Sequence, residues 1–217
     1  MYMNITKQRW LIDLVSLLLF TVLSVVAIVM KEITIFYVMY IFWWDELIKT
    51  LFDGIRFLFN RNLIMDPSIF TIILLVRFFM LCVYMVFIIV CFNVMVEENN
   101  NAGYDKNIEV IFFRNVIFNI TLISFIVREA FNYVNHKKPT ASITSLILPK
   151  GALVLHISII FGMFAWFLSS NNVFQLTEES KKYAPLFTIA PFILIKFLFD
   201  WSSLKAIKKS KENLQYD

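Results

Sequence analysis

Residues 78–96 read FFMLCVYMVFIIVCFNVMV, which is nineteen consecutive positions without a charge. A helix needs about 20 largely apolar residues to cross about 30 Å of hydrocarbon, so this run is long enough to span a bilayer. Residues 14–30 form a second uncharged run, of 17 positions. Runs of this length predict membrane spans, because strands and most core helices of soluble domains are shorter.

The composition of the whole chain supports the same prediction. Of its 217 residues, 59% are hydrophobic and 17% are charged, against about 45–50% and about 25% in soluble domains. The apolar run near the N-terminus is longer than the core of a signal peptide and is followed by no small-residue cleavage site. We therefore interpret it as a retained first span.

The same reading along the chain predicts an all-α fold, a polytopic transmembrane helix bundle. Residues 1–204 form a single transmembrane domain, and residues 205–217 form a basic cytoplasmic tail. Segments 33–59 and 110–134 are the weakest by hydropathy, so four or five spans is the alternative. The preferred prediction is about six spans, over residues 10–30, 33–59, 68–96, 110–134, 151–170 and 185–204.

The orientation follows from the excess of Lys and Arg in cytoplasmic loops. With the N-terminus inside, the inner regions hold twelve Lys and Arg residues and the outer loops hold four, or five with Arg114. The inner set includes the tail segment KAIKKSK, at residues 205–211, whereas the outer loop at residues 97–109 is acidic and turn-rich. Both termini are therefore expected on the cytoplasmic side.

Residues 42–57, FWWDELIKTLFDGIRF, introduce charges into the second predicted span. At a rise of about 1.5 Å per residue, Asp45 and Glu46 lie about 18 Å below the outer end, slightly past the midplane. By the same conversion Lys196 lies level with these acids, and Asp200 lies level with Lys49. Parallel neighbouring helices could then pair Lys196 with either acid, and Lys49 with Asp200.

Other ionisable residues fall in the same half of the bilayer. Arg77 is about 14 Å from the inner edge, and His156 is about 8 Å from it. Charges at a helix centre cost roughly 2.5–3.5 kcal/mol each when unpaired, so partners or water are expected there. We predict an intramembrane polar cluster whose members are Asp45, Glu46, Lys49, Arg77, His156, Lys196 and Asp200.

Two interpretations of this cluster remain open. A buried ion network would hold the helices in register, because the acids and bases nearly balance. A polar cavity or pathway open to the cytoplasm would bind or conduct a ligand, which is the usual meaning of ionisable residues inside a membrane. The sequence has no catalytic motif, no phosphate-binding glycine loop and no metal-ligand spacing. No enzyme activity, catalytic residue, metal or cofactor is therefore expected.

Residues 37–59, YVMYIFWWDELIKTLFDGIRFLF, resemble the early signature of a widespread bacterial membrane protein family of unknown function. Trp43, Trp44 and Glu46 occupy its aromatic pair and polar position. Residues 153–168 and 190–205 resemble the closing pattern of that family, in which a helix with His and Gly precedes a helix with Lys and Asp four apart. His156, Gly162, Lys196 and Asp200 match this pattern. The resemblance implies a membrane helix bundle and brings no activity.

These observations predict a multi-pass protein of the bacterial inner membrane with a binding, transport or channel-like role for an unknown ligand. The alternative is a non-enzymatic membrane accessory or regulatory protein, for example of a bacterial defence or CRISPR locus, whose charges are structural. The lipid bilayer is the expected partner, together with a second copy or another protein. No direct binding of nucleic acid is expected, because the positive charge follows the topology pattern.

Overall fold

The computed structural model describes residues 2–29, 34–59, 67–90, 101–135, 150–170, 192–202 and 205. The described chain is helical with short connections and contains no strand, so the predicted all-α class is confirmed. A further helix covers residues 192–202. The other helices are α1 (Tyr2–Val29), α2 (Ile35–Phe59), α3 (Pro67–Phe87), α4 (Asn101–Ile111), α5 (Val116–Asn135) and α7 (Lys150–Ser170).

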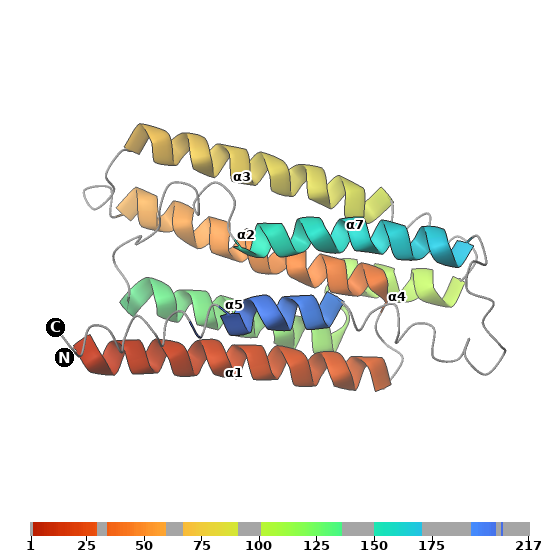
Figure 1. The fold of residues 1–217 in the computed structure, drawn as a ribbon, viewed down its shortest axis with the longest axis horizontal. Helices are drawn as coiled ribbons and strands as arrows, with labels where there is room; N and C mark the ends of the chain where they lie inside the picture. The colour runs from red at the N-terminus through yellow and green to blue at the C-terminus, as the bar shows by residue number, and fades with distance from the viewer. Residues whose placement is uncertain are drawn as a thin grey trace.

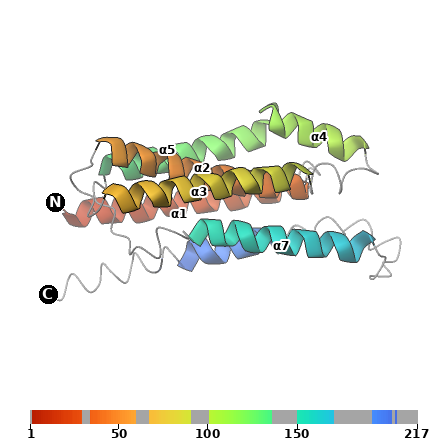
Figure 2. The same cartoon turned by 90° about the horizontal axis from the view of Figure 1, so that it is seen from above.

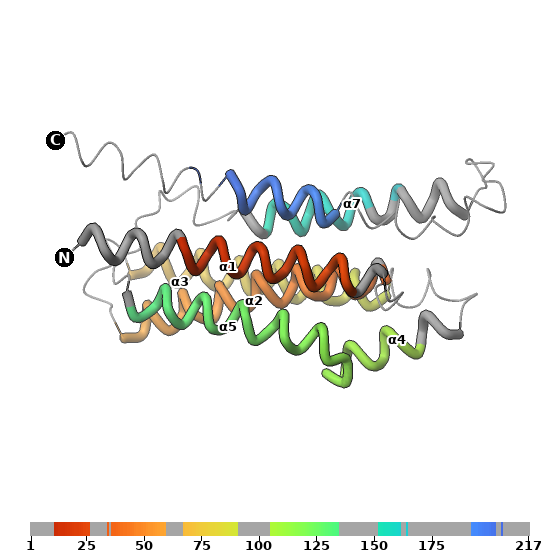
Figure 3. The backbone as a smooth tube through the Cα atoms, turned by 90° about the horizontal axis from the view of Figure 1, so that it is seen from below, coloured from red at the N-terminus to blue at the C-terminus, as the bar shows by residue number. Residues whose placement is uncertain are grey.

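The helices lie side by side, and consecutive helices run in opposite directions except α4 and α5, which run the same way (Figure 1). Helix α2 is central and packs against α3, α4, α5 and α7, whereas α1 packs along α5. Helix α7 and the helix of residues 192–202 lie together on one side of the remaining helices (Figure 2). Helix α1 begins, and the helix of residues 192–202 ends, toward the same end of the bundle (Figure 3).

The first half of α2 forms the core of the bundle. Residues 36–43 are all buried, as expected of a helix that is apolar around its whole circumference. Thr34 caps its N-terminus, because the hydroxyl oxygen accepts a hydrogen bond from Tyr37 N at 3.0 Å. The same hydroxyl donates to Asn107 Oδ1 at 2.6 Å. Asn107 is fully buried, so α4 holds the start of α2 in place.

The outward faces of the helices are rich in large apolar side chains, while six charged side chains of the described residues are buried. Two apolar helical stretches, Pro67–Val90 and Asp105–Val134, are long enough to cross a membrane, and only 28% of each apolar window is buried. The second stretch contains parts of both α4 and α5. Shorter apolar helices cover Leu11–Val26 and Ala152–Phe161. By themselves, two such helices are weak evidence of membrane association. Exposed apolar residues occur on several helices, among them Leu18, Val22, Ile72, Phe79, Ile123, Val127, Phe161 and Leu198.

The prediction of a continuous helix over residues 110–134, preceded by a turn-rich loop, was wrong in part. Helix α4 occupies most of the predicted loop, and the chain breaks between α4 and α5. Phe113 adopts a left-handed backbone with φ of 57°. Its N–H donates to Val110 O at 3.1 Å, and Arg114 N–H donates to Glu109 O at 2.7 Å. These two bonds form a Schellman motif, which terminates α4.

The break was difficult to predict because the left-handed position usually holds Gly. Here a Phe takes it, although the strain costs roughly 1–2 kcal/mol. Its ring contacts Trp44 and Phe118, with centroids 5.5 and 6.0 Å away. Asn119 Nδ2 donates to Phe113 O at 2.6 Å. Asn115 caps α5 by accepting from Phe118 N at 2.9 Å. Tertiary contacts therefore hold a turn that local preference disfavours.

Several other predictions fall on residues outside the described ranges. Residues 91–96 of the third predicted span and residues 185–191 and 203–204 of the sixth are among them. Most of the loop and tail charges that set the predicted orientation also lie there, including Arg61, Lys137, Lys138, Lys181, Lys182, Lys208, Lys209 and Lys211.

Candidate functional site

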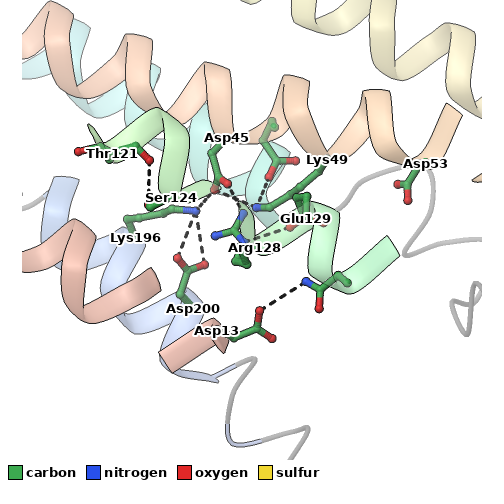
Figure 4. A network of polar contacts seen from close by, with 12 residues as sticks. Asp13, Asp45, Lys49, Asp53, Thr121, Ser124, Arg128, Glu129, Lys196 and Asp200 are labelled. Carbon is green, nitrogen blue, oxygen red and sulfur yellow. Dashed lines mark hydrogen bonds and ion pairs between the residues drawn. The ribbon is translucent and has the colours of Figure 1, made fainter. Parts of the chain in front are cut away.

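Asp45 is the centre of the largest group of ionic contacts. Its side chain has no exposed surface, and it accepts from cations on three helices (Figure 4). Lys49 Nζ, from α2 itself, lies 2.9 Å from Asp45 Oδ2. Arg128, from α5, contacts Asp45 Oδ1, and Lys196, from the helix of residues 192–202, contacts Asp45 Oδ2. The pairing of Lys196 with Asp45 that the helical register predicted is confirmed.

Each of these three cations also contacts a second acid. Lys49 Nζ lies 2.7 Å from Glu46 Oε1, and Arg128 Nε donates to a Glu129 oxygen at 3.0 Å. Lys196 Nζ lies 3.2 Å from Asp200 Oδ2 within its own helix. The predicted pairing of Lys49 with Asp200 is replaced by these contacts, because Lys49 reaches both acids of its own helix. We call Asp45, Glu46, Lys49, Arg128, Glu129, Lys196 and Asp200 the Asp45 cluster.

The Asp45 cluster is closed on one side and partly open on the other. Toward the N-terminal end of α2, the rings of Tyr40 and Trp43 stack in parallel at 6.1 Å between centroids. Tyr40 also stacks on Phe118 of α5, at 5.5 Å. Toward the other end of α2, the side chains of Lys49 and Asp200 are 26% and 31% exposed. Solvent or a ligand would therefore approach from the end where α2 finishes.

Glu46 is the acid with an unused acceptor. Its side chain is 3% exposed, and Oε2 is buried without a hydrogen-bond partner among the described residues. An unsatisfied buried polar atom costs roughly 1–3 kcal/mol, and more when the group is charged. On α7, the buried hydroxyl of Ser158 likewise has no partner within the described ranges. The polar interior thus retains capacity for hydrogen bonds.

Arg77 lies apart from the Asp45 cluster, so its predicted membership was wrong. Arg77 Nη1 donates to Asp53 Oδ2 at 2.8 Å, and Arg56 Nη1 donates to Asp53 Oδ1 at 2.7 Å. This second group connects α2 with the middle of α3. Depth alone placed Arg77 level with Asp45. In the structure its partner is Asp53, which is eight residues, or about two helical turns, farther along α2.

His156 also lies outside the Asp45 cluster, contrary to the prediction. It is on an exposed position of α7, and its Nδ1 is 3.1 Å from Tyr84 Oη of α3. The contact joins α3 and α7 on the outside of the bundle, because helical rotation turns His156 away from α2. Within the described residues, no three His, Cys, Asp or Glu side chains are arranged to hold a metal ion.

Arg128 and Glu129 were missed as cluster members by the sequence reasoning, which counted Arg128 among the inner topology charges. Both are buried, and Arg128 Cζ lies 5.0 Å from the centroid of the Phe125 ring. The neighbouring Asn132 Nδ2 donates to Asp13 Oδ1 of α1 at 3.5 Å. A signal was present, because Thr121, Ser124, Arg128 and Asn132 recur at helical spacing and form one polar stripe on α5.

The charges of the two groups balance when the groups are counted together. Together they contain five acids and five bases, which disfavours a large unpaired charge in the interior. Buried ion pairs nevertheless add little net stability, because removing the charges from water costs about as much as their attraction returns. Comparisons of the chain with protein-family models, curated proteins and solved structures find no match.

Proposed function

We propose that the chain is a multi-pass protein of the bacterial inner membrane with six spans and both termini in the cytoplasm. The exposed apolar faces of its helices and the charged interior support this arrangement, because it is the inverse of a soluble protein. The alternating helix directions place the starts of α1 and α3 at one end (Figure 1). That end carries Arg56 and the partly exposed Asp200, and we assign it to the cytoplasmic side.

Within this arrangement, we propose that the Asp45 cluster serves a binding, transport or channel-like role. The observation that supports it best is the asymmetric access to buried carboxylates. Aromatic rings close the outer side, while Lys49 and Asp200 are partly exposed on the inner side. Glu46 Oε2 then offers an unused acceptor at depth. A ligand that donates hydrogen bonds or carries positive charge would complete this arrangement.

A second candidate function is a membrane accessory protein in which the charges hold helices together. The observation in its favour is that each of the three cations of the Asp45 cluster contacts two acids. Such a network can specify which helices pack together even when it adds little stability.

Topology is testable by labelling single cysteines at positions 103 and 210 with a membrane-impermeant maleimide in intact and permeabilised cells. Gly103→Cys should react from outside, and Ser210→Cys only after permeabilisation. Reaction of both from the same side would contradict the six-span arrangement, whatever the role of the Asp45 cluster.

The two functions are separated by ion flux into proteoliposomes that contain the purified chain. Gradients of protons, Na⁺ and K⁺ are the probes, each followed with a fluorescent indicator. The transport proposal expects flux of at least one ion, reduced about tenfold by Glu46→Gln through the loss of one charged contact. Arg114→Gln is the matched control, because Arg114 is exposed and lies just before α5, about 20 Å along the helix axis from Arg128.

Flux in Arg114→Gln should equal that of the wild type, and all fluxes are compared at equal amounts of folded protein. Absence of flux for all three ions in the wild type would contradict a transport role and favour the accessory role. Equal flux in Glu46→Gln and the wild type would place the pathway outside the Asp45 cluster.

A further inference from the structure

The second ionic group, formed by Asp53, Arg56 and Arg77, carries more positive than negative charge. Both guanidinium groups donate to the single carboxylate of Asp53, at 2.7 and 2.8 Å. One positive charge is therefore not balanced within the group. The three side chains are 24%, 18% and 7% exposed, so solvent screens this excess only in part.

Arg56 has a donor that the protein does not use. Its Nε is buried and has no hydrogen-bond partner among the described residues, although its Nη1 is committed to Asp53. A buried guanidinium nitrogen without an acceptor is costly, more so than a neutral group. The planar fork of Arg matches the oxygens of a phosphate group. The missing partner of this group therefore has the chemistry of an oxyanion.

The surroundings of Arg56 are apolar and exposed. Leu58 and Phe59, at the end of α2, are each 75% exposed. On α3, Ile69 and Ile72 are exposed as well. The Phe57 and Phe70 rings stack at 5.3 Å between centroids and close the seam between the two helices. An anion bound to Arg56 would thus lie beside hydrocarbon surface, which a free inorganic ion does not require.

We propose that Arg56 and Arg77, at the α2–α3 seam, bind the phosphate group of an anionic phospholipid headgroup. The acyl chains lie against the exposed apolar side chains at the end of α2 and the start of α3. Basic pockets between helices on the cytoplasmic side bind anionic headgroups in this way. The proposal rests on the membrane placement, and it is independent of the role of the Asp45 cluster.

The test compares phospholipids bound to the purified full chain. The chain is reconstituted with equal amounts of phosphatidylglycerol and phosphatidylcholine, and the retained lipids are counted by native mass spectrometry. The wild type should retain phosphatidylglycerol preferentially, and Arg56→Gln should reduce that preference about tenfold, as expected for a lost charged contact. Arg114→Gln, which removes one exposed positive charge at the other end of the bundle, should keep it.

A conservative variant and a competition with inorganic phosphate complete the experiment. Arg56→Lys retains the charge but lacks the planar fork, so it should lose part of the preference even if Arg56→Gln fails to fold. Inorganic phosphate at millimolar concentration should not displace phosphatidylglycerol, whereas displacement would show that free phosphate is the ligand. Equal retention of the two lipids by the wild type, or an unchanged preference in Arg56→Lys together with Arg56→Gln, would overturn the proposal. Recovery of the wild type in the membrane fraction tests the placement separately.

Discussion

Lys196 Nζ contacts Asp45 Oδ2, joining two helices whose residues are 151 positions apart in the sequence. Asp45 also contacts Arg128 and Lys49, whereas Lys196 contacts two acids within the described part of the chain, Asp45 and Asp200. The two partners are therefore unequal. Asp45 contacts all three cations, so we expect the substitution of Asp45 and the substitution of Lys196 to change the stability of the fold by different amounts.

The larger number of contacts at Asp45 predicts that its substitution lowers the stability of the fold more than a substitution at Lys196. Asp45→Asn removes the shared negative charge and leaves three cations with one acid each, so it should destabilise the fold by about 3–5 kcal/mol. Lys196→Met removes one of three cations and fills the same volume, so its cost should be clearly smaller. Thermal unfolding in detergent measures both. A larger loss in Lys196→Met than in Asp45→Asn would contradict Asp45 as the common acceptor.

Because His156 lies outside the Asp45 cluster, we expect substitutions at His156 and at Asp45 to change the free energy of unfolding independently. The free-energy changes of His156→Leu and Asp45→Asn should add within about 0.5 kcal/mol, because the two sites share no partner. His156→Leu and Tyr84→Phe, in contrast, remove the same hydrogen bond and should couple by about 1 kcal/mol. Double-mutant cycles on chemical unfolding give both values. Strong coupling of His156 with Asp45 would restore the original assignment of His156 to the cluster.

Because Phe113 has a left-handed backbone, we expect Gly at this position to give a more stable protein than Ala. Both substitutions lose the ring contacts with Trp44 and Phe118, but only Gly adopts a positive φ without strain. Phe113→Gly should therefore be more stable than Phe113→Ala by about 1 kcal/mol, opposite to the order within a helix. Melting temperatures of the two variants provide the comparison. If Ala proves the more stable, residues 112–115 continue the helix and the Schellman turn is absent.

Removal of the Ser158 hydroxyl is expected to raise the stability of the fold rather than lower it. Its hydroxyl is buried without a partner in the described part of the chain, so Ser158→Ala removes an unsatisfied group and should stabilise the fold by up to about 1 kcal/mol. Thr121→Val is the matched control, because the Thr121 hydroxyl donates to Ile117 O at 2.9 Å. That variant should be neutral or less stable. A loss of stability in Ser158→Ala would mean that the hydroxyl has a partner, such as a bound water or ligand.

The sequence by itself predicted most of the helices and the height of each charge along its helix, although it took helix α4 for a loop. Apolar run length and a constant rise per residue need no tertiary information, which explains why Lys196 was matched to Asp45. The polar stripe of α5 was also readable, and it would have identified Arg128. The resemblance to a known membrane family rests on the sequence pattern alone.

Only the tertiary structure decided which faces of the helices meet. Depth gives a height along the bundle but no rotation around a helix axis, so residues at one level can point in opposite directions. Arg77 and Asp45 were therefore matched by height, although α3 brings Arg77 to Asp53. His156 was misplaced for the same reason, because α7 turns it outward to Tyr84. The contacts of Arg128 and Lys196 with Asp45 arise from the packing of α2 against α5 and the helix of residues 192–202, which the sequence of one helix does not determine.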